Sequence, residues 1–302
     1  HGLLGCLSNL LLHPSASAEL LEGEYGGSRN LGALLHVLRL EPEPAEVLLE
    51  DAASALARVL ERRSESVMLL IDLGLLDVIA KCLCHQNEEL LCRVCALGAS
   101  LCGSGAGNEE GAARARRGLV DVGVVPKLSA LLLSSSEEVQ HAAVGLIEPM
   151  MHYMVAARAL RKEGALALLA DVLRMAEAPN RGAPALALLT SMRNDPRAAA
   201  AVREAEALPP LVEMLDPACA DELRATAAAA IEHASHNEAN KAILRELDAI
   251  PKLLRLLEVW QLQTQALRAL NALVAKEEEA AVLVRLSGGI RRPQALPHEP
   301  DD

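Results

Sequence analysis

One sequence pattern, called the phrase below, repeats along this chain of 302 residues. Its clearest copy runs from Gly118 to Ile147, where a turn around Gly123 precedes an apolar stretch with Pro126 near its start. The positions equivalent to Pro126 along the chain are Gly32, Asp77, Pro126, Ala167, Pro209 and Pro251, at intervals of 45, 49, 41, 42 and 42 residues. Such a period predicts stacked units that bury their apolar faces only against neighbouring units.

The spacing of apolar residues within the phrase is helical. Pro126 lies in the first turn of one predicted helix, where proline is tolerated, and Leu128, Leu131 and Leu132 follow on one face. A break of three serines separates it from a second, longer helix that begins at Glu137. Aromatic residues make up only 1% of the chain, which is instead rich in Leu and Ala, and these favour helices over strands. We therefore predict an all-α protein.

The units resemble armadillo repeats, and the resemblance covers nearly the whole chain. It implies a right-handed α-solenoid of about six armadillo-type units, with HEAT repeats as the nearest alternative. By this resemblance, residues 1–13 form a partial repeat helix, because Gly2 to Leu10 reads like the last helix of a unit. Residues 14–290 form the solenoid, and residues 291–302, which carry several prolines, form a disordered tail.

Charge and hydropathy exclude several classes of partner. The formal net charge is −12, and no run of Lys and Arg is longer than the pair Arg116 and Arg117, which argues against nucleic acid. We expect no membrane-spanning helix, because no stretch of about 18 residues is free of charges and turn formers. Seven cysteines form no short secreted framework, so a reducing, cytoplasmic setting is expected.

No catalytic motif is found, and we predict neither an enzyme nor a cofactor. Phosphate-binding and nucleophile-elbow signatures are absent from the sequence. The strongest metal candidate is a cluster consisting of Cys82, Cys84, His85, Cys92, Cys95 and Cys102. Zinc needs four such ligands, but Cys92 and Cys95 fall inside an apolar helical pattern where small buried residues are expected. His233 and His236 lack a third ligand at a suitable spacing. A zinc-binding or enzymatic protein using residues 82–102 is kept as the alternative class.

The resemblance implies that the last helix of each unit lines a concave binding surface. In armadillo proteins that bind extended peptides, a ladder of Asn on this helix bonds the peptide backbone, and Trp lies one turn earlier. The equivalent positions here are Asn9, Arg58, Ala99, Glu148, Thr190, His233 and Ala272. Only the first is Asn, and no Trp stands one turn earlier. Recognition of basic import signals is therefore not expected.

We therefore expect this surface to bind a helical or folded protein partner, which would place its apolar side chains along it. The candidate partner-binding residues are Asn9, Arg58, Arg62, Glu148, His233, Arg268 and Asn271. The positions one turn before the ladder are small or apolar except for Arg268, and the alternative that some of these positions are interior packing is left open. We predict a non-enzymatic interaction scaffold.

A second binding role is a co-chaperone or assembly factor. The resemblance here is to the armadillo part of tetratricopeptide-armadillo proteins that serve myosin or axonemal dynein, which also lack the Asn ladder. The chain does not begin with Met, so we expect it to start inside a longer protein. Ubiquitin-ligase and cytoskeletal arrays are compatible in class as well.

Overall fold

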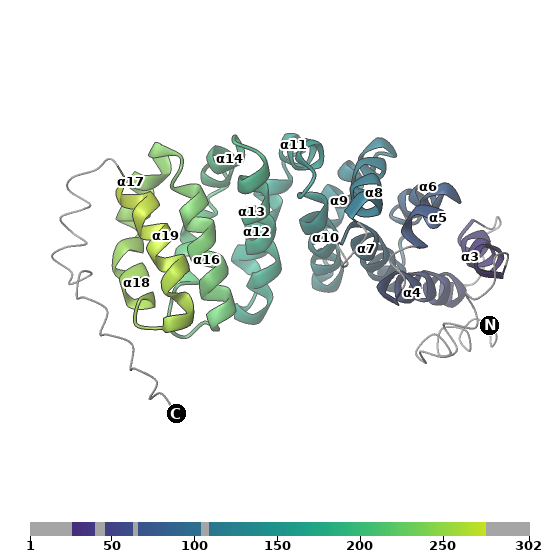
Figure 1. The fold of residues 1–302 in the computed structure, drawn as a ribbon, viewed down its shortest axis with the longest axis horizontal. Helices are drawn as coiled ribbons and strands as arrows, with labels where there is room; N and C mark the ends of the chain where they lie inside the picture. The colour runs from purple at the N-terminus through teal and green to yellow at the C-terminus, as the bar shows by residue number, and fades with distance from the viewer. Residues whose placement is uncertain (1–25, 40–45, 63–65, 104–108, 276–302) are drawn as a thin grey trace, which may run out of the picture.

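The computed structural model describes residues 26–39, 46–62, 66–103 and 109–275. Within these ranges the chain forms α-helices and two short 3₁₀-helices, and no strand (Figure 1). The helices follow one another in groups placed side by side along the long axis. The prediction of an all-α solenoid of about six units is confirmed. The predicted partial helix at 1–13 and the tail at 291–302 lie outside the described residues.

Six units account for the described helices. The first unit contains α3 (Gly26–Val37) and α4 (Glu46–Arg62), and the second contains α5 (Ser66–Asp72), α6 (Leu75–Cys82) and α7 (Glu88–Cys102). The third has α8 (Glu109–Asp121), α9 (Val124–Leu131) and α10 (Glu137–Met150), and the fourth has α11 (Met154–Lys162), α12 (Ala165–Met175), η1 (Ala178–Arg181) and α13 (Gly182–Asn194). The fifth has α14 (Ala198–Glu204), α15 (Leu208–Glu213) and α16 (Asp221–Ala234), and the sixth has α17 (Glu238–Glu246), α18 (Ala249–Leu256), η2 (Trp260–Leu262) and α19 (Gln263–Val274).

The turn between the first and second helix of each unit uses the same left-handed backbone. In units two to six a residue with a positive φ stands one residue before the second helix, or two before it in unit five, and these residues are Gly74 at 82°, Gly123 at 75°, Gly164 at 76°, Glu206 at 54° and Asp248 at 57°. A side chain normally disfavours this conformation, so glycine is the expected residue. Units five and six adopt the turn with a carboxylate residue instead. The period read from the sequence is thus also a period of backbone geometry.

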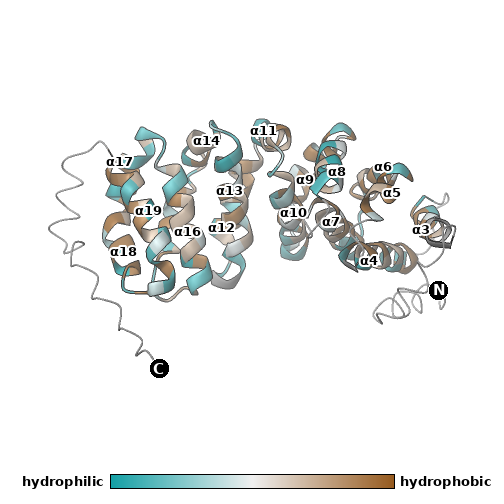
Figure 2. Ribbon diagram, in the orientation of Figure 1, coloured by the Kyte–Doolittle hydropathy of each residue, from teal (hydrophilic) through white to brown (hydrophobic). Residues whose placement is uncertain are grey.

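The third helices form one continuous layer, in which α4, α7, α10, α13, α16 and α19 each pack against the next. The first and second helices of each unit pack behind this layer. Buried Leu, Ala, Val and Ile side chains form a core that continues from unit to unit, and Figure 2 shows hydrophobic stretches in every unit. Each unit therefore completes its core only with its neighbours, as expected of a solenoid.

The same hydrogen bonds recur between successive units. Lys127, one residue after the Pro126 marker, donates its ammonium to the carbonyl of Ala80 in the preceding unit. Lys252, at the same position of unit six, donates to the carbonyl of Val212 at 3.3 Å. These contacts fix how one second helix lies against the next, so the spacing between units is held by polar contacts as well as by apolar packing.

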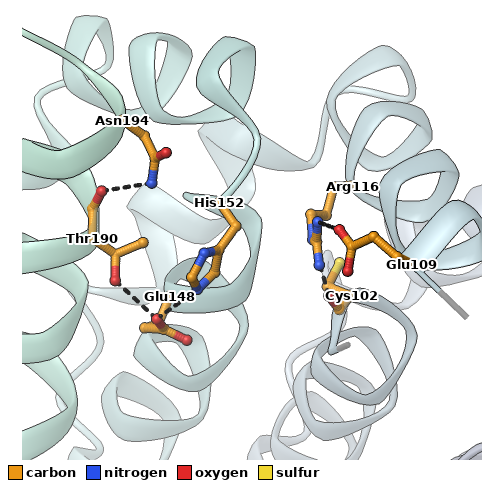
Figure 3. Close-up of polar contacts among 7 residues, drawn as sticks. All are labelled: Cys102, Glu109, Arg116, Glu148, His152, Thr190 and Asn194. Atoms are coloured by element: carbon orange, nitrogen blue, oxygen red, sulfur yellow. Dashed lines mark hydrogen bonds and ion pairs between the residues drawn. The ribbon is translucent and has the colours of Figure 1, made fainter. Parts of the chain in front are cut away.

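A polar residue on a first helix caps the end of the preceding third helix in two units. In unit three, the buried Arg116 donates its Nε to the carbonyl of Cys102 at 3.0 Å and pairs with Glu109 at 2.9 Å (Figure 3). In unit six, the fully buried Asn240 donates Nδ2 to the carbonyl of Ala234 at 3.0 Å. Because carbonyls at helix ends lack intrahelical partners, both side chains supply donors there, and Asn240 adds to the backbone N–H of Asn237, which also donates to Ala234 at 3.1 Å.

Candidate functional site

The outward side of the third helices is the candidate binding surface, and we call it the third-helix surface. It consists of the solvent-facing residues of α4, α7, α10, α13, α16 and α19. Its central ladder positions are Arg58, Ala99, Glu148, Thr190, His233 and Ala272, as the sequence alignment places them. Thr190 is buried, and the other five are half-buried, so the described ladder positions lie at the base of this surface.

Glu148 joins units three and four across this surface. Its Oε1 accepts a hydrogen bond from Oγ1 of Thr190 at 3.0 Å, and Nε2 of His152 lies 3.3 Å from the same oxygen. Asn194, one turn after Thr190, donates to the carbonyl of Thr190 at 2.9 Å (Figure 3). The carboxylate of Glu148 is therefore engaged with α13. It connects two units, and it is less available to a partner than the sequence suggested.

His233 plays a similar part between units four and five. Nε of Arg193, on α13, donates to Nε2 of His233 at 3.2 Å, and the ring of His236 stands edge-on to that of His233 with centroids 5.5 Å apart. Burial, and then the charge of Arg193, lowers the pKa of His233, so its imidazole is neutral at pH 7. The guanidinium of Arg193 remains largely exposed and adds a positive charge to the surface.

The remaining candidates are spread along the chain rather than gathered in one place. Arg58 is half-buried on α4, whereas Arg268 and Asn271 are exposed one turn apart on α19. Asn9 and the side chain of Arg62 lie outside the described residues. The structure therefore brings Glu148 to Thr190 and His233 to Arg193, and it places Arg268 and Asn271 on one helix. Arg193 was missed by sequence reasoning, although its place three residues after Thr190 on the same helix was a usable signal.

The positions one turn before the ladder divide into core and surface. Cys95 and Val144 are fully buried and Ala229 is buried, so in units two, three and five they are packing residues. Leu186 is 39% exposed and Arg268 is exposed, so in units four and six the same position faces solvent. Among these apolar positions Leu186 thus faces solvent, whereas Cys95, Val144 and Ala229 belong to the core.

The cysteines of the 82–102 region are arranged as packing residues. Cys82, Cys95 and Cys102 are buried, and none of the described cysteines is in a disulfide. Burial raises the pKa of Cys95 and Cys102 to about 12, so both side chains are neutral thiols at pH 7. Among the described residues, no group of three or more His, Cys, Asp or Glu is placed to hold a metal ion.

One further finding concerns membranes. Across residues 26–39, 46–62, 66–103 and 109–275, no helix combines the length with the apolar run that crossing a bilayer requires.

Comparison with known proteins gives structural matches only. No protein-family model matches the chain, and no curated protein matches its sequence. The designed armadillo repeat protein YIII(Dq)4CqI matches with a TM-score of 0.71 and 28% identity, over 80% of this chain and 99% of its own. The designed armadillo repeat protein YIII(Dq.V1)4CPAF, in complex with the peptide (KR)4, matches over the same shares with a TM-score of 0.71 and 26% identity. An engineered protein matches 95% of this chain and 77% of its own, with a TM-score of 0.78 and 19% identity.

Proposed function

From its armadillo-repeat fold, which the structural matches confirm, we propose that this chain is a non-enzymatic scaffold that binds a protein partner along the third-helix surface. The single observation that carries the proposal is the continuous layer from α4 to α19, in which hydrogen bonds from Thr190 to Glu148 and from Arg193 to His233 join neighbouring units. A surface that is already ordered loses little conformational entropy on binding.

The part of the surface between α13 and α19 has the clearest chemical character. Leu186 offers an apolar contact, and Arg193 and Arg268 are exposed cations. Asn271 adds an amide that can donate and accept hydrogen bonds. Because Arg193 and Arg268 are positively charged, and Leu186 and the 56%-exposed Leu267 of α19 are apolar, the partner that fits is a folded or helical one that presents one or two apolar side chains beside Asp or Glu.

This chemistry differs from that of the matched complex with the (KR)4 peptide. That designed protein binds a peptide of alternating Lys and Arg. On this chain, Arg193 and Arg268 would repel such a peptide, and the described ladder positions contain no Asn to bond an extended backbone. We therefore propose a different partner, bound in the cytoplasm. A co-chaperone or assembly role is one form of this scaffold function, with the client or chaperone as the partner.

Site-directed crosslinking tests the proposal. A photoreactive amino acid placed at Leu186 is compared with one at Val155, which is similarly exposed, at 46%, on the first helix α11. We expect proteins from a cell extract to crosslink at position 186 and not at 155, and Arg268→Glu to reduce that crosslinking severalfold. Equal yields at both positions, or an Arg268→Glu variant with unchanged crosslinks, would contradict the third-helix surface as the binding site.

A further inference from the structure

A second surface lies on the edge of the solenoid where units three and four meet. There the turn from α9 to α10 and the end of α12 enclose a pocket of about 260 Å³. Its apolar lining includes Leu132 and Val172, both nearly fully buried, and Met175, whose side chain is 83% exposed. Leu133, next to Leu132 in the same turn, is 70% exposed. Two large apolar side chains thus project into solvent beside one pocket.

The exposure of Met175 has a local cause in the length of its helix. The second helices α6, α9 and α18 have 8 residues and α15 has 6, whereas α12 has 11. Val172 stands at the position where α9 ends with Leu131, so the last three residues of α12 extend beyond the shared pattern. Leu173 is buried and Arg174 bonds Asp171 and the carbonyl of Ala205, which holds the extra turn in place. Met175 is therefore presented by an ordered helix.

The polar lining of the pocket is acidic. Glu137 and Asp171 both line it and are exposed, and the guanidinium of Arg174 lies 2.9 Å from Asp171, so one negative charge remains uncompensated between them. Nε2 of His141, another lining residue, is buried and has no hydrogen-bond partner among the described residues. The pocket thus joins an apolar floor to a rim that attracts cations and to a nitrogen that a ligand can satisfy.

We propose that this pocket, the α12 edge pocket, binds a basic linear segment of a partner protein, with one apolar side chain of Leu or Met type inserted between Met175 and Leu132. Lysine or arginine next to that anchor pairs with Glu137 and Asp171. Methionine suits the role because its thioether is flexible and adapts to different apolar side chains. The site lies where the end of α12 meets the start of α10, and its acidic rim differs from the cationic part of the third-helix surface at Arg193 and Arg268, so the scaffold holds an acidic partner on one face and a basic segment on its edge.

A model peptide tests the proposal on the whole chain. The probe is a fluorescein-labelled KKLLKK peptide, with KKSSKK lacking the anchor and EELLEE reversing the charge. Binding is followed by fluorescence anisotropy and by the methyl resonances of the methionines, with that of Met175 assigned from the Met175→Leu spectrum. We expect KKLLKK to bind, to shift the Met175 resonance, and to bind at least about tenfold more tightly than either control peptide.

Two variants locate the site. Met175→Lys is expected to weaken KKLLKK binding about tenfold or more, whereas Met154→Lys, at an exposed methionine on α11, leaves it unchanged. Both positions are exposed, so neither change disturbs the fold. The proposal is overturned if KKLLKK does not bind at up to about 1 mM, if KKSSKK binds equally well, or if both variants weaken binding alike. It is also overturned if sedimentation shows a dimer that Met175→Lys dissociates, because a second copy would then occupy the pocket.

Discussion

Units two to four and units five and six adopt the same backbone turn with different residue types. In the earlier units, glycine at 74, 123 and 164 makes the left-handed turn before the second helix, whereas Glu206 and Asp248 make it in the later ones. The buried first-helix position is Ser66, Ala115, Ala156 and Ala198 in units two to five and Asn240 in unit six. Because stacking imposes one geometry on every unit, residues that would not favour it alone still adopt it.

The largest effect is expected from replacing Asn240, the buried polar residue on the first helix of unit six. Asn240→Ala removes the donor that serves the carbonyls of Ala199 and Ala234, at 2.9 and 3.0 Å, and leaves both buried without that partner. We expect a loss of about 1–3 kcal/mol in the free energy of unfolding, measured by urea titration with circular dichroism. Asn271→Ala, at an exposed site on α19, is the control and should change it by less than about 0.5 kcal/mol. Equal losses in the two variants would show that the buried Asn240 contributes no more to the free energy of unfolding than the exposed Asn271.

A second change makes an early unit resemble the later ones. Gly123→Ala places a Cβ at a φ of 75° with no atom within 4 Å, so the cost is backbone strain alone, about 1–2 kcal/mol. Gly145→Ala is the matched control, since Gly145 lies in α10 with equally open surroundings and ordinary helical geometry. There alanine should stabilise the protein by about 0.5–1 kcal/mol. The free energies of unfolding of the two variants, measured by thermal or urea denaturation, should therefore change in opposite directions.

The reverse exchange gives a smaller effect. Glu206→Gly relieves the left-handed strain at a φ of 54° and should raise the free energy of unfolding by about 0.5–1 kcal/mol, after the entropy lost by glycine is counted. Asp248→Gly should gain less, because Asp tolerates this region better than Glu. If Glu206→Gly instead destabilises the protein, the side chain of Glu206 must stabilise the fold by more than its left-handed backbone costs.

The smallest effect concerns pH and the bond between Arg193 and His233. Because the pKa of His233 is lowered in the folded protein, the unfolded chain binds the proton more tightly. Its contribution to stability is therefore complete above the ordinary value of about 6.5 and is lost as the pH falls below it. The urea midpoint should drop less between pH 7.5 and 5.5 in His233→Gln than in the wild type.

Much of the fold could be predicted from the sequence because the turn and helix signals are local. Gly123 and Pro126 marked a turn and a helix start that the structure confirms, and the same markers located the other units. The surface was harder, because residues four apart on a helix differ by only about 40° in direction. Leu186 on α13 is 39% exposed, whereas Val144 at the equivalent position of α10 is buried, so the repeat alignment did not determine which of these side chains faces solvent.

The hydrogen bonds between units could not be predicted from the sequence for another reason. Asn240 and Arg193 bond residues about one unit away, and no local pattern marks which carbonyl or ring nitrogen will be within reach. Met175 was missed because the extra turn of α12 looks like ordinary helix in the sequence. A comparison of second-helix lengths between units would have found it.

The hydrogen bonds between units also bear on how the chain is made. Those from Asn87 to Glu46, Thr190 to Glu148 and Asn240 to Ala199 span 41, 42 and 41 residues. None of them needs a residue more than about one unit further along the chain. A ribosome that has released two units has therefore already delivered both partners of each such bond between them. Folding can then keep pace with synthesis, and the growing end exposes only one unfinished apolar face at a time.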